Sequence, residues 1–460
     1  MRQGHARPCR FGVSARVSSQ VLAFALTAGL VCATPAAAFA EVLQTDEILS
    51  QSVAQRGLAE SECPDVEAEN ALLIGTDGTV YFARDAHEAV KIASITKVMT
   101  AIVALENASL DTQVVVDEEA ATVGESSAGL QEGDTMSLET ALYAMMIPSG
   151  NDASIAIAKA VGELLPDYDG QDAEAAFVAA MNAKAVELGC EDTLYTNPHG
   201  LDADEFASDC HSTASDVGIV VAYAMKNETF RKIVDAGDTT ITVSTATGGA
   251  RDIALISTDE LIGVYDGICG VKTGTTDEAG YCFAGAVSRT EGEYYSVVLG
   301  SPTSEERFTD TTELFDWVYE NIVQKRLINV TSHVNYQNVQ SPLVARVAHT
   351  EWTDATVPAT VAEPDLTAVV FAADGSIEQT ATYEELTGDI HEGDVIGKLT
   401  FTQNGTVVAE CDLIAAKDQQ APNIFQKVGV FFDRLVRGFQ DQPTVAESVL
   451  LNSTDAIADL

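Results

Sequence analysis

The stretch Ala93-Ser94-Ile95-Thr96-Lys97-Val98-Met99-Thr100-Ala101-Ile102-Val103-Ala104-Leu105 places a serine and a lysine three residues apart. Apolar residues recur at helical spacing after Ser94 with no Gly or Pro among them, which predicts a helix that starts near Ser94 and becomes buried. Side chains three apart share one helix face, so the Lys97 amine is placed to take the proton of the Ser94 hydroxyl. Such a lysine needs a pKa lowered by burial or by neighbouring cations. Alone, the pattern is more typical of a capping serine and a solvated lysine.

A second polar motif, Ser149-Gly150-Asn151, follows a predicted helix that ends at Pro148 and precedes one predicted over 153–164. Ser149 supplies a hydroxyl that can relay a proton. Asn151 supplies an amide that can hold a substrate carbonyl or the lysine. The motif adds the hydrogen-bonding groups that Ser94 and Lys97 lack on their own.

The third motif, Lys272-Thr273-Gly274, lies in a strand predicted over 267–275. Lys272 is a fixed cation, and the missing side chain of Gly274 lets an extended peptide approach the strand. A peptide bound there would pair with the strand edge, and its terminal carboxylate would meet Lys272, Thr273 and Thr275.

With these motifs in this order, the chain resembles the low-molecular-mass penicillin-binding proteins, the serine-type D-alanyl-D-alanine carboxypeptidases of peptidase family S11. The resemblance covers residues 65–325 well and 330–418 more loosely. It includes Asn197-Pro198-His199-Gly200-Leu201 and Ala279-Gly280-Tyr281. It implies an α/β fold: a penicillin-binding transpeptidase/β-lactamase-like domain, with a mainly antiparallel sheet and a helical subdomain, plus a small all-β C-terminal domain.

The resemblance also implies a reaction. Ser94 attacks the bond between two D-alanines of a peptidoglycan stem pentapeptide, the last D-Ala leaves, and water resolves the acyl-enzyme. Lys97 is then the base and Ser149 the proton relay. The substrate-binding residues are the remaining motif positions, Asn151, Lys272, Thr273, Gly274 and Thr275.

Further expectations follow from this reaction. The N–H groups of Ser94 and Thr275 form the oxyanion hole, and β-lactams acylate Ser94. No metal or organic cofactor is needed. The chain departs from the family pattern at Ile92, where Pro is common, and at Cys269, where Asp is usual.

Three other functions stay open. A serine β-lactamase shares the motifs, although Glu163-Leu164-Leu165-Pro166-Asp167 lacks the Glu-x-x-Leu-Asn pattern of the commonest deacylating group. A DD-endopeptidase would use the same residues in a wider cleft. A non-catalytic cell-wall binding protein is disfavoured because the motif residues are intact.

Charge and the N-terminus indicate where the protein works. The formal net charge of −45 excludes nucleic acid as a partner. Residues 1–40 contain four arginines, no acid, an apolar core over 21–33 and an Ala-x-Ala ending at Ala40, which predicts a signal peptide. We therefore expect an exported, extracytoplasmic protein of the cell envelope.

The predicted organisation is a signal peptide over 1–40, a peptidase domain over 41–325 with a polar, helical lead-in over 41–69, a β domain over 330–418, an amphipathic helix over 423–440 and a tail over 441–460. Asp374-Gly375 and Asn404-Gly405 are expected hairpin turns.

The helix over 423–440 carries an apolar stripe and three cations, Lys427, Arg434 and Arg437. One possibility is that this helix lies on an anionic membrane surface, the outer face of the cytoplasmic membrane, as a peripheral anchor. The other is that its apolar stripe packs on the protein itself. Oligomeric state is not indicated.

Six cysteines follow the signal peptide, and an even number in an exported chain favours disulfides. The expected pairs are Cys190–Cys210 and Cys269–Cys282, the latter across a hairpin centred on residues 275 and 276. Cys63 and Cys411 would be joined or free. Six buried, reduced thiols remain the alternative.

Overall fold

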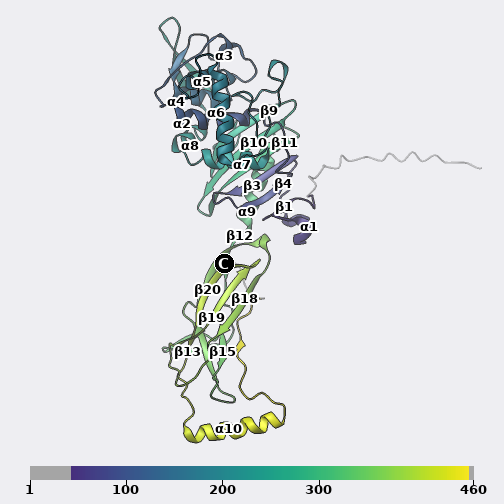
Figure 1. The fold of residues 1–460 in the computed structure, drawn as a ribbon, viewed down its shortest axis with the longest axis vertical. Helices are drawn as coiled ribbons and strands as arrows, with labels where there is room; N and C mark the ends of the chain where they lie inside the picture. The colour runs from purple at the N-terminus through teal and green to yellow at the C-terminus, as the bar shows by residue number, and fades with distance from the viewer. Residues whose placement is uncertain (1–42, 455–460) are drawn as a thin grey trace, which may run out of the picture. The chain divides into compact units, whose positions relative to one another are not determined.

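The computed structural model describes residues 43–454, so the predicted signal peptide lies outside the described residues. A seven-stranded antiparallel sheet of order β2-β1-β4-β3-β11-β10-β9 forms the centre of the domain predicted over 41–325 (Figure 1). Its strands are β1 (Glu47–Ile48), β2 (Gln51–Ser52), β3 (Asn70–Gly75), β4 (Val80–Arg84), β9 (Ile268–Thr276), β10 (Gly280–Arg289) and β11 (Gly292–Ser301). The two halves of this sheet are far apart in sequence and meet where β3 pairs with β11.

Both faces of the sheet are buried because the strands are apolar on both sides. Leu72 belongs to one core with Val221 of α7 (Ala214–Ala224), whereas Leu73 belongs to another with Phe315 of α9 (Glu306–Asn321). Successive strand residues point to opposite faces, so α7 and α9 cover opposite sides of the sheet. This confirms the predicted α/β class with an antiparallel sheet.

The helical subdomain is inserted between β4 and β9. Its helices are α2 (Lys97–Asn107), α3 (Glu118–Thr122), α4 (Leu138–Met146), α5 (Asn151–Gly162), α6 (Ala173–Leu188) and α8 (Glu228–Val234). A four-stranded sheet borders them, with strands β5 (Gln113–Val115), β6 (Thr135–Ser137), β7 (Thr239–Ser244) and β8 (Ala250–Leu255). Ser137 and Asp172 cap α4 and α6 by accepting backbone N–H groups, which explains where these helices start.

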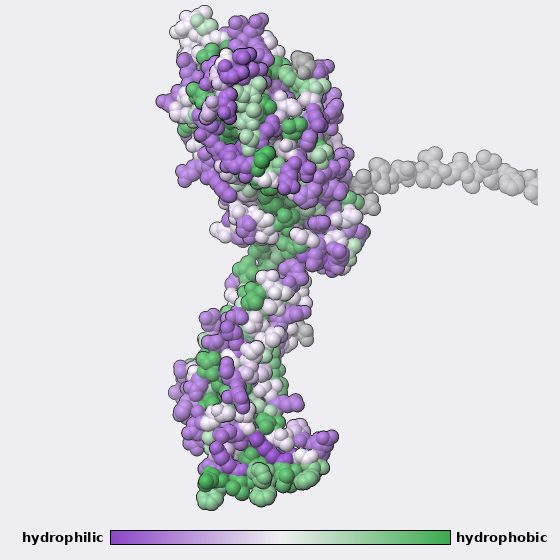
Figure 2. All heavy atoms as spheres, viewed as in Figure 1, coloured by the Kyte–Doolittle hydropathy of each residue, from purple (hydrophilic) through white to green (hydrophobic). Residues whose placement is uncertain are grey.

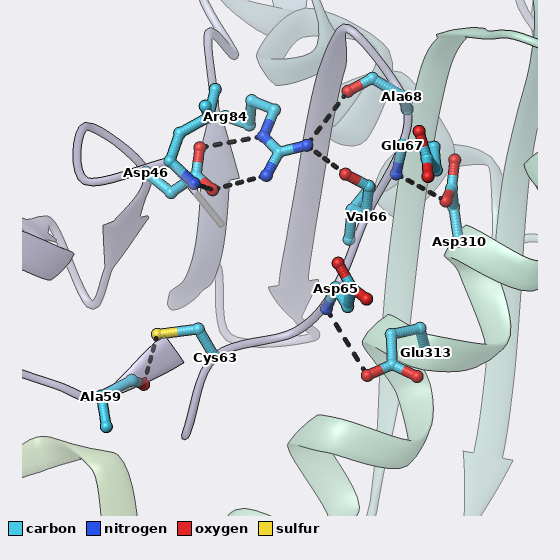
Figure 3. A network of polar contacts seen from close by, with 11 residues as sticks. Asp46, Ala59, Cys63, Asp65, Val66, Glu67, Ala68, Arg84, Asp310 and Glu313 are labelled. Atoms are coloured by element: carbon cyan, nitrogen blue, oxygen red, sulfur yellow. Dashed lines mark hydrogen bonds and ion pairs between the residues drawn. The ribbon is translucent and has the colours of Figure 1, made fainter. Parts of the chain in front are cut away.

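The predicted helical lead-in over residues 41–69 is wrong. The described part forms β1, β2, a single turn of helix α1 (Val53–Arg56) and a 3₁₀ turn, η1 (Glu60–Glu62). Figure 3 shows why it adheres to the domain: the buried Arg84 pairs with Asp46 at 2.7 Å and also donates to the carbonyls of Val66 and Ala68. A buried guanidinium needs several acceptors, and this segment supplies them.

A six-stranded antiparallel sheet of order β18-β19-β20-β16-β15-β21 forms the C-terminal β domain. Its strands are β15 (Ala345–Ala348), β16 (Thr356–Val361), β18 (Ile377–Tyr383), β19 (Val395–Gln403), β20 (Thr406–Ala415) and β21 (Val449–Leu450), accompanied by the pairs β12 (Ile322–Arg326) with β17 (Thr367–Phe371) and β13 (His333–Tyr336) with β14 (Val339–Pro342). Asn404-Gly405 joins β19 to β20 as predicted. The hairpin predicted at Asp374-Gly375 is wrong, because β17 pairs with β12 and β18 with β19.

Helix α10 (Ile424–Phe439) follows β20, and the chain then returns to the sheet through β21. Asn452 secures this return by bonding Leu327 and Gln379. Both ends of α10 are thus attached to the β domain. Within residues 43–454, helices fall short of the length and apolar character that a membrane crossing requires.

All six cysteines of the described chain are free thiols, so the predicted disulfides are wrong. The β9–β10 hairpin pairs Thr276 with Gly280 and Cys282 with Gly274. This register centres the turn two residues beyond the predicted point and moves Cys282 away from Cys269. The Cys269 thiol instead donates to the Ala286 carbonyl, and the Cys282 thiol donates to the Ala279 carbonyl.

Candidate active site

Ser94 lies in a 3₁₀ turn, η2 (Ala93–Thr96), that leads directly into α2. Ala93 has a positive φ of 46°, which turns the chain sharply before the serine. Ser94 stays partly accessible to solvent, whereas Lys97 is 0 % exposed. The Lys97 Nζ lies 2.8 Å from the Ser94 Oγ. The helix predicted near Ser94 is therefore preceded by one tighter turn that presents the hydroxyl beside the amine.

Two more oxygens surround the Lys97 amine. It lies 2.7 Å from Asn151 Oδ1 and 2.8 Å from the His199 carbonyl. Burial first, and then the charge of Lys272, hold the pKa of Lys97 well below its usual range, although Asp152 opposes them. Amide and backbone oxygens only accept, so a neutral amine here directs its lone pair toward Ser94.

The second motif occupies the junction of α4 and α5. Ser149 has a positive φ of 62° and is buried, and Asn151 begins α5. The buried Asp152 accepts from the Ser127 hydroxyl at 2.6 Å and from the Ala128 N–H at 3.0 Å, which ties the 124–130 loop to this junction. Among the residues that the structure describes, the Ser149 hydroxyl has no hydrogen-bond partner.

The third motif lies on β9, next to the serine turn. A Cβ atom at Gly274 would sit 2.8 Å from the Ile92 carbonyl oxygen and 3.2 Å from the Ala93 Cβ. The space beside Gly274 is therefore filled by the turn that carries Ser94, and not left open for a peptide as the sequence suggested. Thr273 shares a 2.6 Å hydrogen bond with Thr258.

Lys272 is buried, and its Nζ donates to the Thr273 carbonyl at 3.0 Å. Burial and the neighbouring Arg307 lower the pKa of Lys272 to about 7, while Asp259 opposes them. The buried Arg307 of α9 donates to the Thr275 hydroxyl at 2.9 Å and to the Gly274 carbonyl at 3.3 Å. A second cation therefore lies on this strand edge.

The Asn197–Leu201 loop contacts Lys97 and packs against the serine turn. Asn197 Oδ1 accepts the N–H groups of His199 and Gly200, and a Cβ at Gly200 would lie 1.9 Å from the Ala93 carbonyl oxygen. Burial, with Lys97 nearby, lowers the pKa of His199 to about 3, so its ring is neutral. Here the histidine contributes its backbone carbonyl to the lysine.

Comparisons with known proteins agree with this geometry. The sequence model of the Peptidase_S11 family, described as D-alanyl-D-alanine carboxypeptidase, matches residues 58–303. The chain belongs to this family. The chain is 28% identical over 362 residues to the D-alanyl-D-alanine carboxypeptidase DacF of Bacillus subtilis, covering 77% of this chain and 86% of the relative.

Solved structures show the same peptidase fold. The crystal structure of the Streptomyces K15 DD-transpeptidase is 30% identical with a TM-score of 0.52, and covers 56% of this chain and 98% of that chain. The D-alanyl-D-alanine carboxypeptidase DacD of Francisella tularensis is 22% identical with a TM-score of 0.53, and covers 78% of this chain and 94% of that one. The second likeness concerns the fold alone, and it extends into the β domain.

Sequence reasoning missed Arg307 and Thr258 at this site. Arg307 stands in a helix start that is otherwise acidic, Glu305-Glu306-Arg307, and its burial could not be read from that pattern. The spacing of residues in this helix does not distinguish a buried arginine from one that is exposed to solvent. Thr258 is an ordinary polar residue of a connecting segment, and only the tertiary fold brings it to Thr273.

Proposed function

We propose that this protein is an exported DD-carboxypeptidase that removes the terminal D-Ala of peptidoglycan stem pentapeptides through an acyl-enzyme on Ser94. The observation that carries the proposal is the 2.8 Å contact between Ser94 Oγ and the fully buried Lys97 amine. Its lowered pKa makes Lys97 a base rather than a fixed cation.

In the first step the Ser94 Oγ attacks the carbonyl carbon of the penultimate D-Ala, and its proton passes to Lys97 Nζ. Asn151 and the His199 carbonyl hold the amine in place. The N–H groups of Ser94 and Thr275 stabilise the developing oxyanion, an interaction worth about 3–4 kcal/mol in comparable hydrolases. Ser149 relays the proton to the leaving nitrogen as the C–N bond breaks. Water then adds to the ester carbonyl and restores the hydroxyl.

The substrate's terminal carboxylate is held by β9. Lys272 and Thr273 supply a cation and a hydroxyl there, and Arg307 adds a guanidinium whose Thr275 contact keeps it at the strand edge. Gly274 lets the strand approach the serine turn. Two buried cations favour a substrate with a free C-terminal carboxylate, as in a stem pentapeptide.

Labelled penicillin tests this function directly. A carboxypeptidase forms a long-lived ester on Ser94, and Ser94→Ala forms none. Rapid turnover of the drug would identify a β-lactamase, and an unlabelled but folded protein would identify a binding module. Release of peptides from cross-linked stem dimers in place of D-Ala would identify an endopeptidase.

We further propose that α10 holds the enzyme at a lipid surface. Figure 2 shows hydrophobic residues gathered along this helix. Its exposed apolar side chains are Ile424, Phe425, Val428, Phe431, Phe432, Leu435, Val436 and Phe439. Phe425 and Phe439 are each 85% exposed, a large apolar surface for a protein in water.

The cations of α10 are engaged within the protein, contrary to the use that the sequence suggested for them. Lys427 pairs with Glu351 at 3.0 Å and Arg437 with Asp354 at 2.5 Å. Arg434 donates to the carbonyls of Thr350 and Trp352. These bonds turn the polar face of α10 toward its own domain, so apolar burial is the main source of lipid affinity.

A further inference from the structure

Asp259 lies beside the carboxylate-binding edge on a segment held against β9. Thr258 fixes this segment through its 2.6 Å bond to Thr273 and through a 3.1 Å bond from its N–H to the Ile147 carbonyl. The Asp259 Oδ1 accepts the Leu261 N–H at 2.9 Å. Its Oδ2 is buried and has no hydrogen-bond partner in the described part of the chain. A buried carboxylate oxygen without a donor is costly unless a cation compensates for it.

The cations that act on Asp259 are Lys272 of β9 and Arg307 of α9. Burial raises the pKa of Asp259 to about 6, so the carboxylate is mainly ionised above neutral pH. The charges of Arg307 and Asp259 in turn act on Lys272, and the charge of Lys272 acts on Lys97 of α2. Asp259 is the acid that acts on Lys272 and opposes the loss of its proton, whereas Asp152 acts on Lys97 and Glu260 acts on Arg307.

We propose that Asp259 is a positioning residue for the substrate's terminal carboxylate, which it assists by keeping the Lys272 ammonium charged near neutral pH. Asp259 touches no substrate atom. Its carboxylate acts through Lys272 across the segment that Thr258 fastens to the strand. This inference rests on the proposed function, since it concerns how the same site captures a stem peptide.

The proposal predicts the direction of a pH shift. Capture of the carboxylate weakens as Lys272 loses its proton, which gives the basic limb of the kcat/KM profile. In Asp259→Asn the Lys272 pKa falls further, because its counter-charge is gone, so the basic limb moves to lower pH. At about pH 8 we expect KM for a stem-pentapeptide mimic to rise about three- to tenfold while kcat stays within about twofold.

Two matched variants control this test. Asp259→Glu keeps the charge and should keep the basic limb of the wild type, even if its rate is lower. Glu385→Gln removes the same charge from an exposed residue of the β domain and should leave the profile unchanged. Thermal unfolding at each pH monitors the fold, and Asp259→Ser replaces Asp259→Asn if the latter does not fold.

A basic limb that does not move, or a loss of activity equal at all pH values, would overturn the role of Asp259. A shift in Asp259→Glu as large as in Asp259→Asn would do the same. These outcomes differ from failure of the proposed function, in which the wild-type protein itself would release no D-Ala.

Discussion

The Lys97 amine lies 2.8 Å from the Ser94 hydroxyl, inside a site where no part of the lysine is exposed. Two residues three apart in sequence are thus brought into hydrogen-bond contact by one 3₁₀ turn and the first turn of α2. Removing the amine should remove the base without moving the hydroxyl.

For Lys97→Ala we therefore expect the rate of acylation by labelled penicillin to fall by roughly 10²–10⁴-fold, the usual contribution of a general base. The label on Ser94, measured by mass spectrometry over time, checks this. Lys184→Ala, which removes a lysine paired with Glu106 on the helical subdomain, serves as the control and should label normally. Substantial labelling of Lys97→Ala would refute the assignment.

Replacing Gly274 by Ala should displace the serine turn. The new Cβ would meet the Ile92 carbonyl oxygen at 2.8 Å and the Ala93 Cβ at 3.2 Å, so the turn would have to shift. Misplacement of a nucleophile by about 1 Å costs on the order of 100-fold, so acylation should drop at least tenfold in a folded protein. Gly429→Ala, at an open position on α10, is the matched control. Equal acylation by both variants would contradict the packing role of Gly274.

Lys272 should make the stability of the fold depend on pH. Its pKa is about 7 in the folded protein and about 10.4 when exposed in the unfolded chain, so between these values the unfolded state binds the extra proton. The free energy of unfolding then rises with pH, by up to about 1.4 kcal/mol per unit from this group.

In Lys272→Met this contribution is absent. Urea unfolding at about pH 7, 8 and 9 should therefore show the wild type gaining stability relative to the variant as pH rises. A constant difference between the two proteins across this range would mean that Lys272 has an ordinary pKa.

Lipid binding by α10 should depend on its apolar face and little on lipid charge. A buried Phe contributes about 1.5–3 kcal/mol, so Phe425→Asp should weaken binding to phosphatidylcholine vesicles at least tenfold in a flotation assay. Val407→Asp, at an exposed position on β20, is the control. Because Lys427 and Arg437 are paired internally, added anionic lipid should not strengthen binding. Binding that requires anionic lipid and is reversed by salt would mean that these cations contact the membrane.

The sequence predicted those parts of the fold that local patterns encode. Helix α6 runs over 173–188 as expected, because Asp172 caps it and Gly189 ends it in a left-handed conformation. The strands around Lys272 were also placed nearly correctly. The turn between them lies at 277–279, and not at residues 275 and 276 on which the predicted Cys269–Cys282 disulfide was centred, so that disulfide is absent.

The site was predictable only as far as its residues fall in motifs. Ser94, Lys97 and Asn151 come together through hydrogen bonds that the motif order anticipates. Arg307 and Asp259 lie outside any motif, and their importance depends on burial that only the folded chain creates. The cations of α10 were visible in the sequence, but their partners, such as Glu351, are far away along the chain.

The acyl-enzyme mechanism on Ser94 can be tested by measuring D-Ala release from a stem-pentapeptide mimic by the wild type and by Ser94→Ala. We predict steady release by the wild type, and none above background by the variant, although it keeps the same fold. Release by both proteins, or by neither while both are folded, would contradict an acyl-enzyme carboxypeptidase built on Ser94.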